Sequence, residues 1–556
     1  MQKTIERSPN FEQWLPDAPQ DISLQRGISS RRFLVELLVI VLLSAVAYIS
    51  LAVFWIKFSR AEVFFAECAR EMLTTNNFIT PLYHSQPFFD KPIFVYWLII
   101  AMFKTLGVSH LTARLPIIVA SLLTISSTAL AGAYLFGRRT GLLAALLLAS
   151  SFMYLSFSTL CMSDTFLVLF DTLTLIAAYA GIISEKNRAL NWWLASVSMG
   201  FAFLTKGPIG IVLPAVTIFG YILLCKKGHF IKASHIFRAI ITIALVASPW
   251  FYAAYLANGP QSMVHFFIQE NLQRFAGSTY DAHRPFWYTI TSFFLGFAPW
   301  SIFLPMALYW YCNSVRQCGY KVAGAIKVSD DLNYANTEPK LDLPLFSKVI
   351  TRLPLELSAE LYLWIWVFVS VGFFCFSRGK CDYYTLPAFP AAALLLAHYV
   401  GNSLTKYSIG FKTVATTILI STILFSVIGL PQINKLIPIA KYVAIIKNAP
   451  KNVRVGIDVS AAAWIDEILF QSGKDAQRIE GSQQIDDFMR KSEPAILILP
   501  ENKYNLLTAE RKREYPIILT NIVSTHPITP GYLLEKQGNI ADPMPFVVMT
   551  NIKELK

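Results

Sequence analysis

The sequence is poor in charged residues. Asp, Glu, Lys and Arg make up 15% of its 556 residues, whereas hydrophobic residues make up 54%. Ordinary soluble domains carry about 25% charged residues. A chain with so little polar surface cannot bury all its apolar side chains in cores surrounded by water. The composition therefore excludes a soluble globular protein, a disordered chain, a coiled coil and a collagen, and it indicates an integral membrane protein.

The sequence also lacks the motifs of several other protein classes. Its seven cysteines are odd in number and scattered, without CxxC or zinc-finger spacing, so no disulfide framework is predicted. It contains no Walker loop, HExxH, GxSxG or GxGxxG pattern, so ATP is not the expected energy source. The net charge of +13 is interpreted as a signal for membrane topology and lipid-surface attraction rather than for nucleic acid.

Apolar stretches long enough for membrane helices recur along the chain. About eleven spans are predicted, within a range of eleven to thirteen. They lie near residues 33–57, 109–136, 140–157, 163–183, 190–204, 207–225, 236–256, 287–311, 359–376, 383–400 and 408–430. A shorter apolar stretch, residues 93–103, is predicted to be a juxtamembrane helix. The predicted fold class is therefore a polytopic α-helical membrane protein.

The loops between the spans predict the orientation. Basic residues such as Arg138, Lys186 and Lys226 occupy alternate short loops, which the positive-inside rule places in the cytoplasm. We therefore expect a multi-pass protein of the plasma (inner) membrane with a cytoplasmic segment 1–32, a membrane domain 33–430 and a C-terminal domain outside. The predicted first outer loop is 58–108, and the predicted long cytoplasmic loop is 312–358.

Residues 441–556 have a different composition. Short β-like runs such as Arg454–Asp458 and Ala495–Leu499 alternate with polar helical stretches such as Gln484–Lys491. This alternation is typical of a small α/β domain. The sequence thus predicts an extracytoplasmic α/β domain after the last span.

Ionisable residues beside apolar spans are costly and therefore mark candidate functional sites. The predicted topology gathers many of them in separate loops on the outer face. These residues are Glu62, Glu67, Arg70, Asp90, Lys91, Asp164, Lys206, His283, Arg284, Arg378, Lys380 and Asp382.

Several of these residues also have purely structural interpretations. Glu67 and Arg70 lie three residues apart in a predicted helix and can pair with each other. Lys91 either anchors the chain at the membrane interface or neutralises a phosphate. Asp164 either caps the fourth span or faces a site at its outer end. Asp171 lies deeper in the same span and is interpreted as a structural hydrogen-bonding residue.

Six short stretches resemble membrane-embedded glycosyltransferases of the GT-C fold. The likeness is to glycosyltransferase family 39, which includes bacterial aminoarabinose transferases and protein O-mannosyltransferases. The stretches occur in the family's order across about residues 60–400. They are Ala61–Leu73, Phe89–Trp97, Met162–Asp164, Leu204–Pro208, His283–Tyr288 and Ser377–Lys380.

The resemblance implies transfer of a sugar from a polyprenyl-phosphate carrier to a lipid, glycan or protein acceptor on the extracytoplasmic face. The family's first-loop Asp-Glu pair is Ala61-Glu62 here, so Glu62 or Asp164 is the expected catalytic acid. The resemblance associates Asp90 and His283 with a divalent metal. The implied substrate-binding residues are Glu67, Arg70, Lys91, Tyr96, Lys206, Arg284, Arg378 and Lys380.

Two other functions stay open at the level of the sequence. A transporter or flippase would need charged residues near the bilayer midplane and internal repeats, and only Asp171 comes near the first condition. A non-catalytic binder of lipid-linked sugar is compatible with Ala61. Neither the sugar nor the acceptor follows from the sequence.

Overall fold

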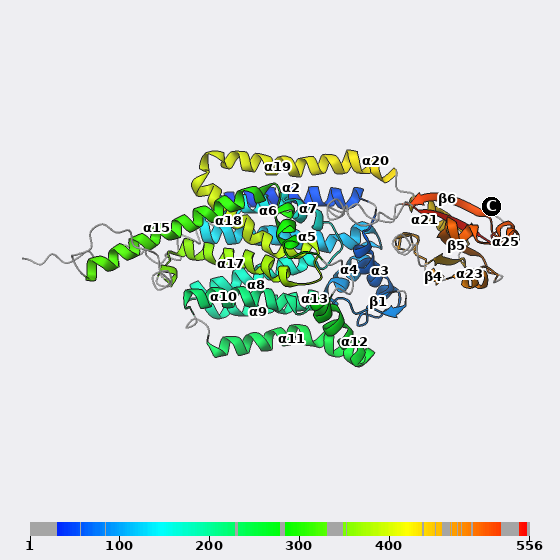
Figure 1. Cartoon of the computed structure of the whole chain (residues 1–556), viewed down its shortest axis with the longest axis horizontal. Coiled ribbons are helices and arrows are strands. Elements are labelled where there is room, and N and C mark those ends of the chain that lie inside the picture. The colour runs from blue at the N-terminus through cyan, green and yellow to red at the C-terminus, as the bar shows by residue number, and fades with distance from the viewer. Residues whose placement is uncertain are drawn as a thin grey trace, which may run out of the picture.

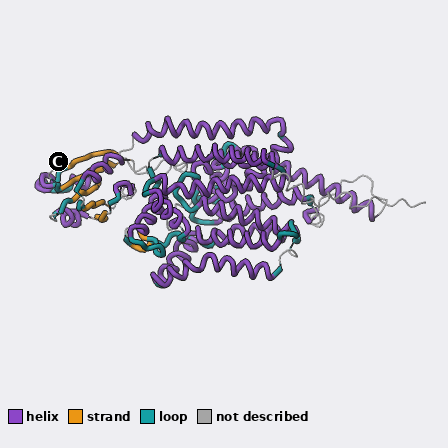
Figure 2. Tube along the Cα trace, turned by 180° about the vertical axis from the view of Figure 1, so that it is seen from behind, coloured by secondary structure: helices purple, strands orange, loops and turns teal. Residues whose placement is uncertain are grey.

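The computed structural model shows a bundle of long helices with a small sheet domain at one end (Figure 1). Seen from behind, the strands are confined to that domain and to one short hairpin beside it (Figure 2). The residues it does not describe are 1–29, 56, 84, 228–231, 278–283, 331–348, 352, 436–438, 451, 459–466, 469, 475, 480, 491–492, 524–543 and 553–556.

Each predicted apolar stretch forms one helix or a run of two or three consecutive helical segments. Six of the described helical segments are long and apolar enough to cross a membrane. These are α2 (Arg31–Phe54), α5 (His110–Phe136), α8 (Asp164–Ile183), α11 (Ala233–Asn258), α17 (Leu355–Phe376) and the continuous run Thr405–Asn434, which contains α19 (Ser408–Leu424) and most of α20 (Leu430–Lys435). The predicted helical membrane fold is confirmed, while the number of spans stays a prediction.

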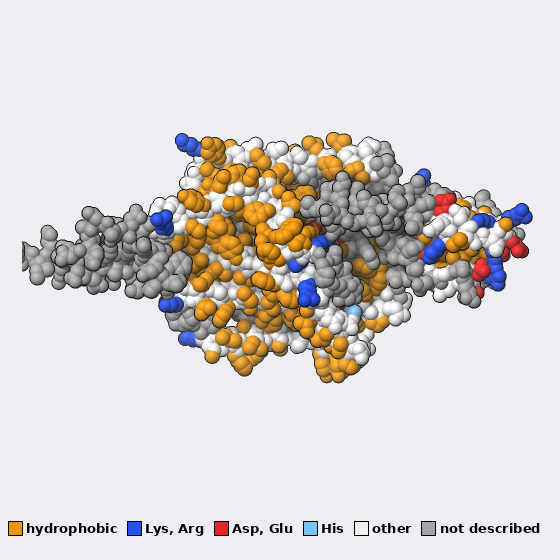
Figure 3. Space-filling model, viewed as in Figure 1, with side chains coloured by type: hydrophobic (Ala, Val, Ile, Leu, Met, Phe, Trp, Pro, Cys, Tyr) orange, Lys and Arg blue, Asp and Glu red, His pale blue; other side chains and the backbone are white. Residues whose placement is uncertain are grey.

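The remaining apolar helices pack between these long ones. They are α6 (Arg138–Ser150), α7 (Phe152–Phe157), α9 (Arg188–Lys206), α10 (Ile209–Cys225) and α18 (Phe389–Ser403). A further pair, Tyr288–Gly296 and Trp300–Gly319, is bent by 108°. The bundle's outer side chains are largely hydrophobic, and Lys and Arg are sparse on the face shown in Figure 3. Such a surface is suited to lipid rather than to water.

One helix extends beyond the predicted end of its membrane span. Helix α15 (Leu304–Asp330) continues far beyond the predicted start of the cytoplasmic loop at residue 312 and projects from the bundle at the end opposite the sheet domain (Figure 1). Loss of hydrophobicity ends a membrane span but need not end a helix, because the helix can continue into water with its backbone hydrogen bonds intact. The predicted cytoplasmic loop 312–358 therefore begins inside this helix, and its position relative to the membrane stays a prediction.

The first outer loop is folded rather than open. It contains α3 (Arg60–Thr74), the hairpin β1 (Leu82–Tyr83) and β2 (Gln86–Pro87), and α4 (Phe94–Leu106). A capping box starts α3: the Ser59 backbone N–H donates to Glu62 Oε2 at 2.8 Å, and the Ser59 hydroxyl accepts from the Glu62 N–H. This reciprocal cap fixes where α3 begins. The loop lies at the end of the bundle that adjoins the sheet domain (Figure 1).

The C-terminal domain is an α/β unit, as predicted. Its five strands have the order β4-β3-β5-β7-β6. Strand β3 (Arg454–Asp458) pairs in parallel with β4 (Ala476–Ile479) and β5 (Ala495–Pro500), whereas β7 (Met544–Thr550) pairs antiparallel with β5 and β6 (Ile517–Val523). Helices α21 (Ile439–Asn448), α23 (Gly481–Met489), α24 (Glu501–Asn505) and α25 (Ala509–Glu514) accompany the sheet. The predicted strand Arg454–Asp458 coincides with β3.

Candidate active site

A large cavity opens where the first outer loop meets the ends of α8 and α9. It encloses about 1250 Å³, which is ample for a sugar phosphate with part of a lipid chain. Its polar side chains come from the β2–α4 connection, the start of α8, the end of α9 and the π-helical segment η3 (His265–Gln273). Its charged lining residues are Asp90, Lys91, Asp164, Lys206, Glu270 and Arg274.

Asp164 and Lys206 both line this cavity and form a buried ion pair. Asp164 is the first residue of α8, and Lys206 is the last residue of α9. The Lys206 ammonium also lies 5.0 Å from the ring centroid of Tyr384. Gly207, with φ of 81°, ends α9 directly after the lysine. The start of α8 and the end of α9 therefore bring a carboxylate and a cation together. The two residues belong to the predicted outer-face cluster.

Segment η3 and the residue that follows it add two charged side chains to the cavity, Glu270 and Arg274. Arg274 follows η3 and lies 3.3 Å from the buried carboxylate of Glu270, while the Lys91 ammonium lies 3.9 Å from the same group. Burial lowers the pKa of Lys91, and the nearby Arg274 lowers it further. A negative phosphate beside these cations would offset that effect. Lys91, Lys206 and Arg274 thus form a cavity wall suited to an anion.

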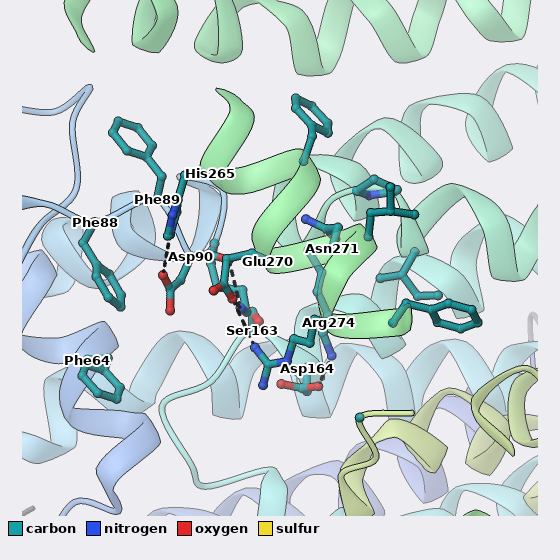
Figure 4. A pocket seen from close by; sticks show the side chains of 18 of the residues that line it. Phe64, Phe88, Phe89, Asp90, Ser163, Asp164, His265, Glu270, Asn271 and Arg274 are labelled. Atoms are coloured by element: carbon teal, nitrogen blue, oxygen red, sulfur yellow. Dashed lines mark hydrogen bonds and ion pairs between the residues drawn. The ribbon is translucent and has the colours of Figure 1, made fainter. Parts of the chain in front are cut away.

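Asp90, His265 and Glu270 fit a divalent metal. Their ligand atoms all lie within 4.8 Å of one another, and His265 Nε2 is 3.3 Å from Asp90 Oδ1 (Figure 4). His265 Nδ1 lies 2.6 Å from Gln269 Oε1, a contact that orients the ring. Glu270 Oε1 is buried and has no hydrogen-bond partner among the described residues, as expected for an atom that awaits a ligand.

Glu62, the predicted first-loop acid, does not line the cavity. Its side chain is completely buried, and its Oε1 accepts from Arg114 Nε at 2.9 Å. The same oxygen accepts the backbone N–H of Cys161 at 3.0 Å. The preceding residue, Ala61, does line the cavity. Glu62 is therefore held in the protein interior by groups that satisfy its charge.

Arg114 ties this part of the chain together. Its guanidinium is 1% exposed and donates to the backbone carbonyls of Ala52, Trp55 and Lys57, at 2.6–3.2 Å, as well as to Glu62. It thereby joins its own helix, α5, to the end of α2 and the start of α3. Through Glu62 the same network reaches Cys161, three residues before Asp164.

Other predicted site residues lie away from the cavity lining. Glu67 and Arg70 form the predicted helix pair, 2.6 Å apart and buried. Arg284 contacts Asp382 and Tyr288, and Lys380 donates to the carbonyls of Ser377 and Arg284. Arg378 is exposed. Lys91, Tyr96, Asp90, Asp164 and Lys206 do line the cavity, and His283 lies outside the described residues.

The structure adds His265, Glu270 and Arg274 to the predicted site. All three lie between the predicted spans 236–256 and 287–311, but nothing in their spacing showed that η3 would fold over the cavity. In Figure 4 the His265 side chain lies beside Asp90, and the Arg274 side chain lies near Ser163 and Asp164. Because a π-helix advances by more residues per turn than an α-helix, an α-helical periodicity gives the wrong faces here.

Comparisons with known proteins match the membrane part. Residues 90–252 match a family model described as dolichyl-phosphate-mannose-protein mannosyltransferase. The chain is 28% identical over 378 residues to an undecaprenyl phosphate-alpha-4-amino-4-deoxy-L-arabinose arabinosyl transferase of Pectobacterium atrosepticum, covering 66% of this chain and 59% of the relative. It is 29% identical over 250 residues to a Proteus mirabilis protein of the same description, covering 44% of this chain and 45% of the relative.

The fold comparison extends over almost the whole chain. The structure superposes on the crystal structure of ArnT from Cupriavidus metallidurans bound to undecaprenyl phosphate with a TM-score of 0.68, covering 95% of this chain and 99% of that one at 17% identity. The chain has a GT-C fold of the ArnT type. It spans about half to three-fifths of the length of the curated relatives that it matches in sequence.

The first prediction concerns Glu62. Glu62→Gln leaves the buried Arg114 guanidinium without its counter-charge, and breaking a buried pair in this way costs about 3–5 kcal/mol. We expect a marked fall in the melting temperature of the protein in detergent. The matched control is Glu36→Gln, because Glu36 pairs with Arg32 on the surface and should contribute less than about 1 kcal/mol. Equal stability of the two variants would contradict a structural role for Glu62.

Proposed function

We propose that the protein transfers a sugar from a polyprenyl-phosphate carrier to an acceptor hydroxyl at the outer face of the plasma membrane. One observation carries the proposal: Lys91, Lys206 and Arg274 converge on one cavity beside Asp164. The ArnT-type fold and the sequence likeness to arabinosyl transferases support it. A non-catalytic binder would need the cations but not an acid placed beside them.

The cations suit the charge that develops during transfer. In a sugar–phosphate–lipid diester the phosphate carries one negative charge. Attack of an acceptor oxygen on the anomeric carbon breaks the bond between that carbon and the phosphate oxygen, and the departing lipid phosphate gains a second negative charge. Lys91, Lys206 and Arg274 would stabilise this charge more strongly in the transition state than in the ground state.

Asp164 is the proposed acceptor of the hydroxyl proton. It contacts Lys206 in the resting protein, and this contact fixes the position of the carboxylate. When a donor phosphate shares the Lys206 ammonium, the carboxylate becomes free to accept the proton of the attacking hydroxyl. The apolar lining residues, which include Phe64, Phe65 and Ile209, would hold the start of the lipid chain. The acceptor is proposed only as a lipid, a glycan or a protein.

A divalent metal is the proposed cofactor, held by Asp90, His265 and Glu270. Among the described residues, the charged side chains that line the cavity are three acids and three cations, so a bound phosphate would add a negative charge that a metal would offset. When bound, the metal would supply further positive charge next to the phosphate. Lys91 and Arg274 both contact the Glu270 carboxylate. When these cations bind the phosphate, Glu270 would become available in part to the metal.

A sugar-transfer assay distinguishes the role of Asp164 from that of Asp171, another acid of the same helix. Asp164→Asn should lower the rate of sugar transfer from a synthetic polyprenyl-phosphate donor at least tenfold, about 1.4 kcal/mol, with folding retained. The matched control is Asp171→Asn, two turns along the same helix, because Asp171 is buried but does not line the cavity. Wild-type transfer rates in Asp164→Asn would remove Asp164 from the reaction.

Metal binding is measured directly on the purified protein. We expect one equivalent of zinc or manganese to bind, and Asp90→Asn and His265→Gln each to weaken that binding by about 10–100-fold, as for the loss of a ligand or its support. Chelation should lower sugar transfer in parallel. Glu36→Gln, far from the cavity, is the control for surface binding. Equal metal affinity in all four proteins would contradict this site.

A further inference from the structure

A second buried carboxylate links the C-terminal domain to the first outer loop. Glu467 lies between β3 and β4, and its side chain is 1% exposed. Its Oε2 accepts the backbone N–H of Phe58 at 3.0 Å, and its Oε1 lies 2.5 Å from His110 Nε2. Gln471 of the same helical turn donates to Oε1 at 2.5 Å. The carboxylate is thus satisfied by groups from both sides of the domain junction.

An aromatic side chain accompanies this carboxylate. Phe470 is 4% exposed, and its ring centroid lies 5.0 Å from that of Phe58, 5.5 Å from that of His110 and 6.1 Å from that of Phe103. Among the described residues, Phe470 is the only member of the C-terminal domain in the hydrophobic cluster that underlies the cavity. The domain therefore inserts one charged and one aromatic side chain into the membrane part's own core.

Glu467 and Phe470 contact the chain at Phe58, immediately before the start of α3. Phe58 directly precedes Ser59, the N-cap of α3, and the Arg114 guanidinium lies 5.0 Å from the centroid of the Phe58 ring. Helix α3 carries Ala61, Phe64 and Phe65, which line the cavity. A shift of Phe58 would consequently move this wall of the cavity.

The chemistry of the contact favours one defined docking position. A buried carboxylate is costly unless it is paired and hydrogen-bonded, and Glu467 meets its partners only when Phe58 and His110 are in place. Lys57 lies nearby, and burial lowers its pKa to about 8, against an opposing effect of Glu467. Non-specific apolar contact would tolerate sliding, whereas this arrangement does not.

We propose that Glu467 and Phe470 are positioning residues of the cavity, through which the C-terminal domain fixes α3 and thereby the binding of the lipid-linked donor. This inference rests on the proposed function for its kinetic readout. Neither residue lines the cavity, so the effect passes through Phe58 and the start of α3. It should alter donor binding more than the chemical step, because Asp164 and Lys206 are not displaced.

The test uses the full chain in detergent and two measurements. Glu467→Ala and Phe470→Ala should each raise the KM for a polyprenyl-phosphate sugar donor at least about fivefold, with kcat within about twofold. Hydrogen exchange, measured without substrate, should become faster at the amides of residues 58–65. Glu467→Gln should lie between wild type and Glu467→Ala, because its amide oxygen still accepts from the Phe58 N–H. The control is Glu493→Gln, on an exposed glutamate of the same domain.

The two measurements separate the possible failures. Unchanged exchange and unchanged KM in Glu467→Ala and Phe470→Ala would overturn the proposal. Faster exchange throughout the chain would also overturn it, because that result describes general destabilisation rather than positioning of α3. If the wild-type chain transfers no sugar, the proposed function fails by itself, while faster exchange confined to residues 58–65 would still support the docking of α3 by Glu467.

Discussion

The buried ion pair between Arg114 and Glu62 is the contact on which the end of the bundle beside the sheet domain depends. Arg114 comes from α5, reaches the carbonyls that end α2 and holds Glu62, whose side chain accepts from the N-cap of α3. Glu62 passes the connection on to the Cys161 backbone. A guanidinium has donors in a fixed planar fork. The Arg114 side chain therefore sets the positions of α2, α3 and α5 relative to one another and, through Glu62, the position of the segment that leads from Cys161 to Asp164.

Two groups of charged residues at this end differ in their chemistry. Arg114, Glu62, Glu67 and Arg70 are paired and enclosed, so that they specify structure. Lys91, Lys206, Arg274 and their acids face a cavity, and they retain capacity for a ligand. In such a cavity a developing negative charge interacts strongly with fixed cations, because little water competes with them. The paired interior residues fix the positions of the segments that carry the charges lining the cavity.

The sequence predicts the elements well and the site in part. Lipid requires long apolar helices, so the spans follow from hydropathy, and the short β-like run at residues 454–458 forms the expected strand. Lys91, Asp164 and Lys206 meet because the topology places their loops on one side. Glu62 could not be assigned in this way, since its partner Arg114 lies 52 residues away and within a predicted apolar span. The contribution of His265 and Glu270 depends on a π-helical fold that no local pattern indicates.

A structure of the protein with bound polyprenyl phosphate would test the central claim most directly. The account predicts the phosphate among Lys91, Lys206 and Arg274, with the Glu62 carboxylate still on Arg114. A phosphate bound instead by Arg284, Arg378 and Lys380, or a Glu62 side chain turned into the cavity, would contradict it.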